Sequence, residues 1–90
     1  MQQSICPVDV ICVCSAEGEI RPLRIRLEDE RRELIRRDIE EVVSRKEIPY
    51  IGAEATIFWC RGMIWGRRCL LELKYSMRCH TWYLLSKMHG

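Results

Sequence analysis

Residues 55–85, ATIFWCRGMIWGRRCLLELKYSMRCHTWYLL, decide the fold. The stretch contains three runs rich in aromatic and β-branched residues, ATIFWCRGM, RRCLLELKY and HTWYLL, with short polar breaks between them. Such residues suit a pleated, half-buried surface. Three consecutive strands with short connections predict an antiparallel meander. A meander implies a small β domain, and by itself it indicates no chemistry.

A hairpin is predicted upstream of the meander, over about residues 8–28. The run VDVICVC at residues 8–14 is nearly all apolar, and Gly18 follows it in a turn. In PLRIRLE, at residues 22–28, apolar and charged residues alternate with a period of two. This alternation is typical of a strand with one buried face.

Residues 32–47 fit either a helix or a strand. Apolar residues at Leu34, Ile35, Ile39, Val42 and Val43 fall on one helical face. Glutamate and arginine residues four positions apart add to the helical pattern. A strand in this segment would have poor alternation, so the local pattern favours a helix.

Several blocks of the chain resemble a group of small uncharacterised bacterial proteins of about this length. They are GEIRPLRIRLEDE, IEEVVSRKEI, ATIFWCRG, and LLELKY followed by HTWYLL. The resemblance spans roughly residues 8–88 and implies a small all-β fold with a third strand, but no activity and no functional residues. The chain departs from that pattern at residues 31–32, where a turn glycine is expected, and at residues 36–37, where an apolar residue is expected.

We therefore predict one small, mainly β domain over residues 1–90. It is an antiparallel meander or a partly open barrel of five to six strands, with a possible helix within residues 32–47. Residues 1–7 are expected to be loose and residues 86–90 frayed. The predicted core draws on the hairpin and the meander: Val10, Cys12, Leu23, Ile25, Leu27, Ile57, Trp59, Leu71, Leu73, Tyr83 and Leu85.

The composition, 48% apolar and 31% charged, is ordinary for a globular protein. No apolar stretch reaches the roughly 18 residues that indicate a membrane-spanning helix. The first twenty residues carry three carboxylates and lack the basic start and apolar run of a secretory signal. We expect a cytoplasmic protein with no membrane partner.

The six cysteines are expected to be free thiols, because the cytoplasm is reducing. Only one residue separates Cys12 from Cys14, whereas structural zinc sites favour roughly two to four intervening residues. Cys79 and His80 are adjacent, so in a strand they would point to opposite faces. A nucleophilic pair of His80 with Cys69 or Cys79 lacks a third, orienting group. We predict no metal, no cofactor and no catalytic residue.

The two halves of the chain carry opposite net charge. Residues 1–52 hold nine basic and eleven acidic residues, and residues 53–90 hold six basic and two acidic residues. Such halves attract each other within one chain or across a dimer. The edges of a small meander also recruit partners or a second copy. These features predict a non-enzymatic binding module that acts through protein contacts or self-association.

The alternative is an accessory protein that binds single-stranded nucleic acid on a basic, aromatic β-surface. Small β-barrels stack bases on exposed aromatic side chains beside a basic groove. One tryptophan, Trp65, lies in a predicted hairpin tip, where a core role is least expected. The candidate binding surface consists of Trp65, Arg67, Arg68 and Arg78.

Overall fold

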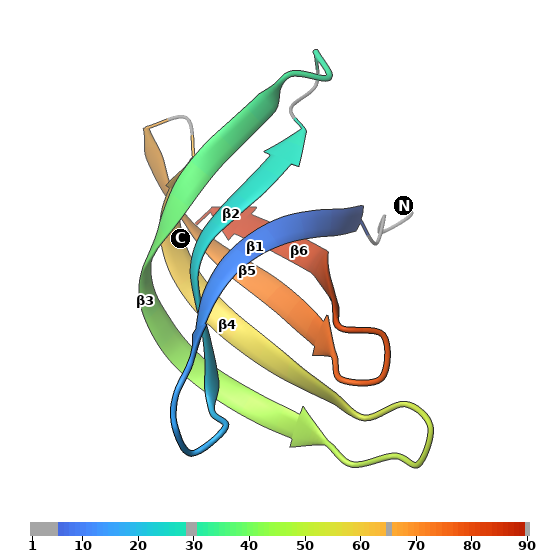
Figure 1. Ribbon diagram of the computed structural model, residues 1–90. Coiled ribbons are helices and arrows are strands. Elements are labelled where there is room, and N and C mark those ends of the chain that lie inside the picture. Colours follow the sequence, from blue (N-terminus) through green and yellow to red (C-terminus); the bar gives the residue numbers. More distant parts are fainter. Residues whose placement is uncertain (1–5, 29–30, 65, 90) are drawn as a thin grey trace.

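Six antiparallel strands, arranged in chain order, form a closed barrel (Figure 1). The computed structural model describes residues 6–28, 31–64 and 66–89. The strands are β1 (Cys6–Cys14), β2 (Ile20–Glu28), β3 (Leu34–Ile48), β4 (Ala55–Ile64), β5 (Arg67–Ser76) and β6 (Thr81–His89). The described residues form no helix, and so none that is long and apolar enough to cross a membrane. The predicted mainly β fold is confirmed.

The segment that fits either a helix or a strand is the 15-residue strand β3. Its residues Ile35, Ile39 and Val42 pack against the barrel core. The ladder to β4 shifts register between Ile39 and Glu41 and again between Val42 and Ser44. Each of these bulges inserts one extra residue, which lengthens the spacing of inward side chains from two residues to three. The bulges therefore explain why the apolar pattern of this strand resembles that of a helix.

The core fills the inside of the barrel. One cluster contains the buried apolar side chains Ile25, Leu27, Phe58, Cys60, Ile64, Cys69, Leu71, Leu73, Trp82 and Leu84. The prediction is confirmed for Ile25, Leu27, Ile57, Leu71 and Leu73, which are buried, and Val10 packs partly buried against the cluster. Both faces of β4 and β6 are rich in apolar residues, so alternation alone did not define their inward faces.

The predicted facing was wrong on β4 and β6. Phe58 points inward on β4, while its neighbour Trp59 is only half-buried. On β6 the inward side chains are Trp82 and Leu84, so Tyr83 and Leu85 are also half-buried. The ladder to β5 skips Leu85, which lies in a bulge.

Cys12 and Leu23 were also predicted to lie in the core, and both are exposed. Leu23 is the extra residue of a bulge, because the β1–β2 ladder passes from Arg24 directly to Pro22. The bulge turns Pro22 inward and leaves Leu23 outside, although simple alternation groups Leu23 with Ile25.

The strands extend closer to both ends of the chain than predicted. Cys6 and Pro7, expected to be loose, pair with β6. Residues 86–89, expected to be frayed, pair with β5. Residues 1–5 and 90 lie outside the described part of the chain.

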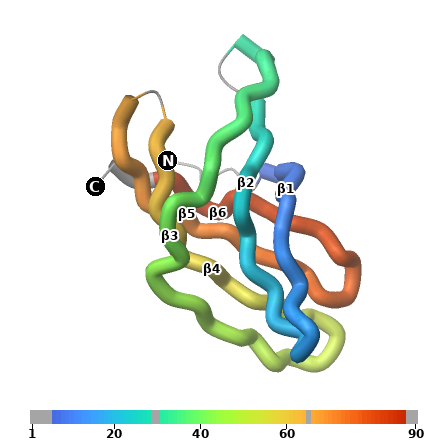
Figure 2. Tube along the Cα trace, turned by 60° about the vertical axis from the view of Figure 1, so that its left-hand side comes forward, coloured from blue at the N-terminus to red at the C-terminus, as the bar shows by residue number. Residues whose placement is uncertain are grey.

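The barrel is incomplete on both sides of the first hairpin (Figure 2). The β2–β3 ladder ends where Arg24 meets Asp38. The β1–β6 ladder ends where Val8 meets Trp82. Beyond these two points, residues 9–23 form a two-stranded arm, the β1–β2 arm, whose strands pair only with each other among the described residues. Figure 2 shows the arm diverging from β3.

Candidate functional site

The three described arginines of the predicted nucleic-acid-binding surface do not lie together. Arg67 and Arg68 begin β5, and Arg78 lies in the turn that follows the same strand. At the usual rise of a strand, the ten residues of β5 separate these positions by about 30 Å. All three arginines are exposed, but they lie at opposite ends of the barrel. Trp65 lies outside the described residues.

The aromatic side chains near the β5–β6 turn are used in packing. Trp82 is 6% exposed, and its ring lies 5.5 Å from that of Phe58 and 5.0 Å from that of Tyr75, measured between centroids. The hydroxyl of Tyr75 forms a 2.9 Å hydrogen bond with Nδ1 of His80. These contacts hold the rings against the core, so Trp82 offers no exposed face for base stacking.

The thiols and carboxylates do not assemble a reactive centre. Among the described residues, no group of three His, Cys, Asp or Glu side chains is placed to hold a metal ion. None of the six cysteines is in a disulfide bond, and Cys60 and Cys69 are buried. Burial raises the pKa of the Cys60 thiol from 9.0 to about 12. The Cys60 thiol therefore stays protonated at neutral pH and is a poor nucleophile.

The barrel interior is occupied by side chains. Ile25, Leu71 and Leu73 have no exposed surface, and Phe58 is 1% exposed. Barrels of this size are commonly filled in this way, whereas larger barrels enclose ligand cavities. The surface of the barrel is therefore the part available for binding.

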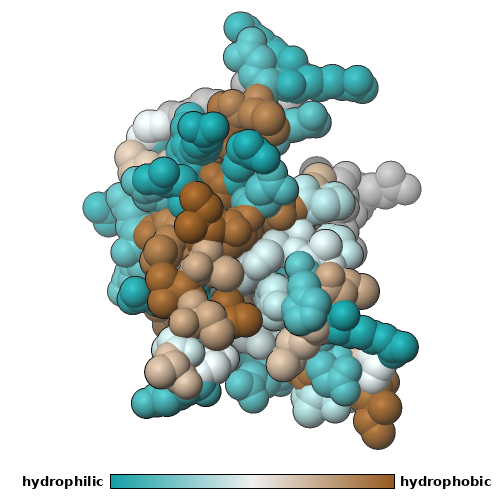
Figure 3. Space-filling model, viewed as in Figure 1, coloured by the Kyte–Doolittle hydropathy of each residue, from teal (hydrophilic) through white to brown (hydrophobic). Residues whose placement is uncertain are grey.

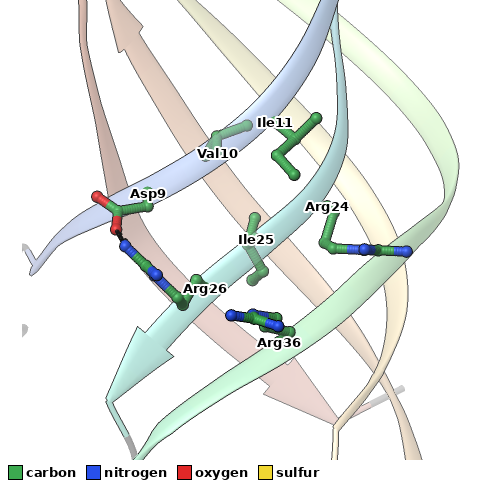
Figure 4. A pocket seen from close by; sticks show the side chains of 7 residues that line it. All are labelled: Asp9, Val10, Ile11, Arg24, Ile25, Arg26 and Arg36. Atoms are coloured by element: carbon green, nitrogen blue, oxygen red, sulfur yellow. Dashed lines mark hydrogen bonds and ion pairs between the residues drawn. The ribbon is translucent and has the colours of Figure 1, made fainter.

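Of the three arginines that Figure 4 shows on the outer face of β2 and β3, two form ion pairs. Arg26 forms an ion pair with Asp9, and Nε of Arg24 lies 2.7 Å from Oδ1 of Asp38. Arg36 lies opposite Arg26 on the ladder, between these two pairs. The carboxylates offset most of the positive charge, so this face is a poor anion site.

The outer edge of β1 is different, because its backbone is unpaired and its side chains are apolar. Past Val8, no described residue pairs with β1 on the side away from β2. Ile11 is 60% exposed and Val13 is 41% exposed. The strand is regular, because the bulge in its ladder to β2 belongs to Leu23. No charged residue occurs from Val10 to Ala16.

Figure 3 shows apolar side chains gathered over β1 and the strands beside it, with hydrophilic residues around them. A regular, apolar edge strand with free N–H and C=O groups is a template for pairing with another chain. Residues 9–14 are hereafter called the β1 edge. They are the candidate functional site.

The unpaired edge of β3 lacks these properties. Residues 39–48 pair with β4, but among the described residues they have no partner on the β2 side. This edge contains two bulges and five charged residues, Glu40, Glu41, Arg45, Lys46 and Glu47. Bulges and charges are the features by which natural sheets discourage pairing at an edge. Of these two edges, the β1 edge is the one suited to accept a strand.

The sequence contains a signal for this edge, although the sequence-based prediction placed Val10 and Cys12 in the core. The run VDVICVC has apolar residues on both faces, which is typical of a strand buried on both sides. In the structure Val8 and Val10 are half-buried, but Ile11, Cys12 and Val13 are exposed. An apolar strand that the fold leaves uncovered indicates a binding surface.

The β1–β2 arm ends in an ordered, acidic turn. Oγ of Ser15 accepts hydrogen bonds from the backbone N–H groups of Glu17, at 3.2 Å, and Glu19, at 3.1 Å. Gly18 adopts the positive φ of 87° that the turn requires. The side chains of Glu17 and Glu19 are exposed. The arm therefore presents negative charge at its tip and apolar side chains along β1.

Comparisons of the chain with protein-family models, with curated proteins and with solved structures found no match. The resemblance to a group of small bacterial proteins thus stays a prediction.

Proposed function

We propose that this protein is a non-enzymatic binding module that takes up an extended segment of a protein partner as an added strand on the β1 edge. The proposal rests on the unpaired backbone of residues 9–14, within which the side chain of Ile11 is 60% exposed. Strand addition satisfies free N–H and C=O groups and covers exposed apolar side chains in one step.

The chemistry of the edge defines the partner segment. Ile11 and Val13 are two residues apart in a regular strand, so they share one face. Side chains directly opposite them contribute most when they are β-branched or aromatic. The partner should therefore be an extended segment with such residues at alternating positions. Carboxylates and lysines opposite Ile11 would lose hydration without gaining a partner.

The alternative of single-strand nucleic-acid binding has less support. Arg78 lies at the opposite end of β5 from Arg67 and Arg68, and Trp82 is packed into the core. Steep weakening of oligonucleotide binding with added salt would favour the alternative, because phosphate contacts release counterions.

Selection from a displayed library of random linear peptides tests the proposal. We expect the selected peptides to have alternating apolar residues, and N-methylation of alternate peptide amides should abolish binding because it removes ladder donors. Ile11→Lys should weaken binding roughly tenfold, since it replaces an apolar cross-strand contact with a charge.

A matched control is available on the unpaired edge of β3. Val43 is 44% exposed, similar to Val13, and lies on β3. Val43→Lys makes the same chemical change away from β1 and should leave peptide affinity unaltered. Equal losses for Ile11→Lys and Val43→Lys, or no selected peptide at all, would count against strand addition at β1.

A further inference from the structure

We infer that the strand taken up by the β1 edge is the β1 edge of a second copy of this chain, so that two barrels pair antiparallel about a two-fold axis at Cys12. The inference rests on the proposed function, because it needs the same free edge. It adds the identity of the partner and the register of the pairing.

The register follows from the regular geometry of β1. A two-fold axis at Cys12 places Ile11 of one copy opposite Val13 of the other, and the reverse. Ile11 and Val13 lie on one face of β1, so the four exposed apolar side chains of the two copies come together on that face. Val10 then lies opposite Cys14 on the second face. Each pairing joins side chains of the same face, as a continuous sheet requires.

The charges of the edge permit this pairing. An antiparallel copy brings no like charges together over Val10–Ala16, because this stretch is uncharged. The nearest carboxylate, Asp9, forms an ion pair with Arg26 of its own chain and would lie opposite Ser15 of the second copy. The same self-pairing on β3 would have to accommodate two bulges and five charges.

Oppositely charged turns favour a second copy over an unrelated apolar strand. Trp82 of β6 pairs with Val8, so a strand added to β1 beyond Val8 lies in line with β6. The added strand runs in the same direction as β6, because both are antiparallel to β1. Its carboxyl end therefore approaches the β5–β6 turn.

When the added strand is β1 of a second copy, its acidic turn follows directly. Glu17 and Glu19 of that copy then face a turn that contains Arg78 and His80 and no carboxylate, Met77–His80. The two-fold axis forms this contact twice. Neither Glu17 nor Arg78 forms an ion pair within its own chain in the described structure, so both charges are available to a second copy.

Sedimentation equilibrium of charge-reversed variants tests the arrangement. The wild-type chain should show a reversible monomer–dimer equilibrium. Glu17→Lys and Arg78→Glu, each alone, should raise the dimer dissociation constant roughly tenfold, because two attractive contacts become repulsive. An equimolar mixture of the two variants should recover near-wild-type association, because each copy then presents a charge opposite to that of its partner. Arg68→Glu, at the far end of β5, is the control and should not change the equilibrium.

Cross-linking locates the axis independently. In a chain with Cys6→Ser, Cys14→Ser and Cys79→Ser, Cys12 is the only exposed thiol. A short bis-maleimide reagent, which forms one thioether with each thiol, should join two such chains at Cys12. A matched chain that keeps only Cys79 exposed should remain uncoupled.

The outcomes separate this inference from the proposed function. A chain that stays monomeric at all concentrations, but binds selected peptides at β1, overturns the inference and leaves strand addition intact. A dimer that shows no recovery on mixing and no coupling at Cys12 overturns the arrangement. A monomer that binds no peptide contradicts both proposals.

Discussion

Val8 lies opposite Trp82, and this pair is the point at which β1 leaves β6. From Cys6 to Val8, the strand pairs with β6 and closes the barrel. After Val8, the strand continues to Cys14 and, among the residues that the structure describes, pairs with β2 alone. The side chain of Trp82 is buried against Phe58, so the end of the ladder is anchored in the core. The β1 edge therefore begins at a position fixed by the core.

Truncation of a core leucine should nearly unfold the domain. Leu73 has no exposed surface and lies in the central cluster. Leu73→Ala should lower the free energy of unfolding by about 2–5 kcal/mol through lost burial and the cavity left behind. Leu34→Ala, at a side chain that is 61% exposed, is the control and should change stability little. Equal melting temperatures for Leu73→Ala and the wild-type protein would contradict the assigned facing of β5.

The six thiols should divide into two classes of reactivity. Cys6, Cys12, Cys14 and Cys79 are exposed and should react with a maleimide in the folded protein. The buried pair, Cys60 and Cys69, should react only after denaturation. Intact mass spectrometry before and after denaturation counts the modified thiols. Rapid modification of all six in native buffer would show that the barrel interior is accessible.

Alkaline pH should destabilise the fold through Cys60. Burial raises the pKa of its thiol to about 12 in the folded chain, against 9.0 for the free group. Below about pH 9 the thiol is protonated in both states, so its contribution to stability is fully present. Between these values the unfolded chain loses the proton while the folded chain keeps it, so stability falls as pH rises.

Urea unfolding of wild type and Cys60→Ala at about pH 8 and about pH 11 measures this effect. The variant should lose less stability over that interval than the wild-type protein does, whatever the truncation itself costs. Equal losses of stability in the two proteins would contradict a raised pKa, because they would mean that the Cys60 thiol has the same pKa in the folded and unfolded chains.

The sequence was sufficient to predict the β class, the first hairpin and the meander, because aromatic and β-branched residues concentrate in short runs there. It was insufficient where bulges occur. Leu23 and Leu85 were placed in the core by simple alternation, and each is skipped by its ladder. Bulges depend on how strands meet across the barrel, which a single strand's pattern does not contain.

The candidate site could not be predicted from the sequence, for a related reason. Whether the apolar run ending at Cys14 is covered depends on how far β6 extends beside β1, and that is set by the position of the turn before Thr81. The separation of Arg78 from Arg67 likewise depends on the length of β5. Both depend on segments that are distant in the sequence, and the periodicity within one strand carries no information about them.

Amide hydrogen exchange, followed residue by residue at low and high protein concentration, tests most directly whether the β1 edge is where this protein associates. We expect protection to rise with concentration at backbone amides within residues 9–14, while amides of residues 40–46 on β3 exchange at the same rate throughout. Protection that appears on β3 instead, or exchange in β1 that is independent of concentration, would contradict association through β1.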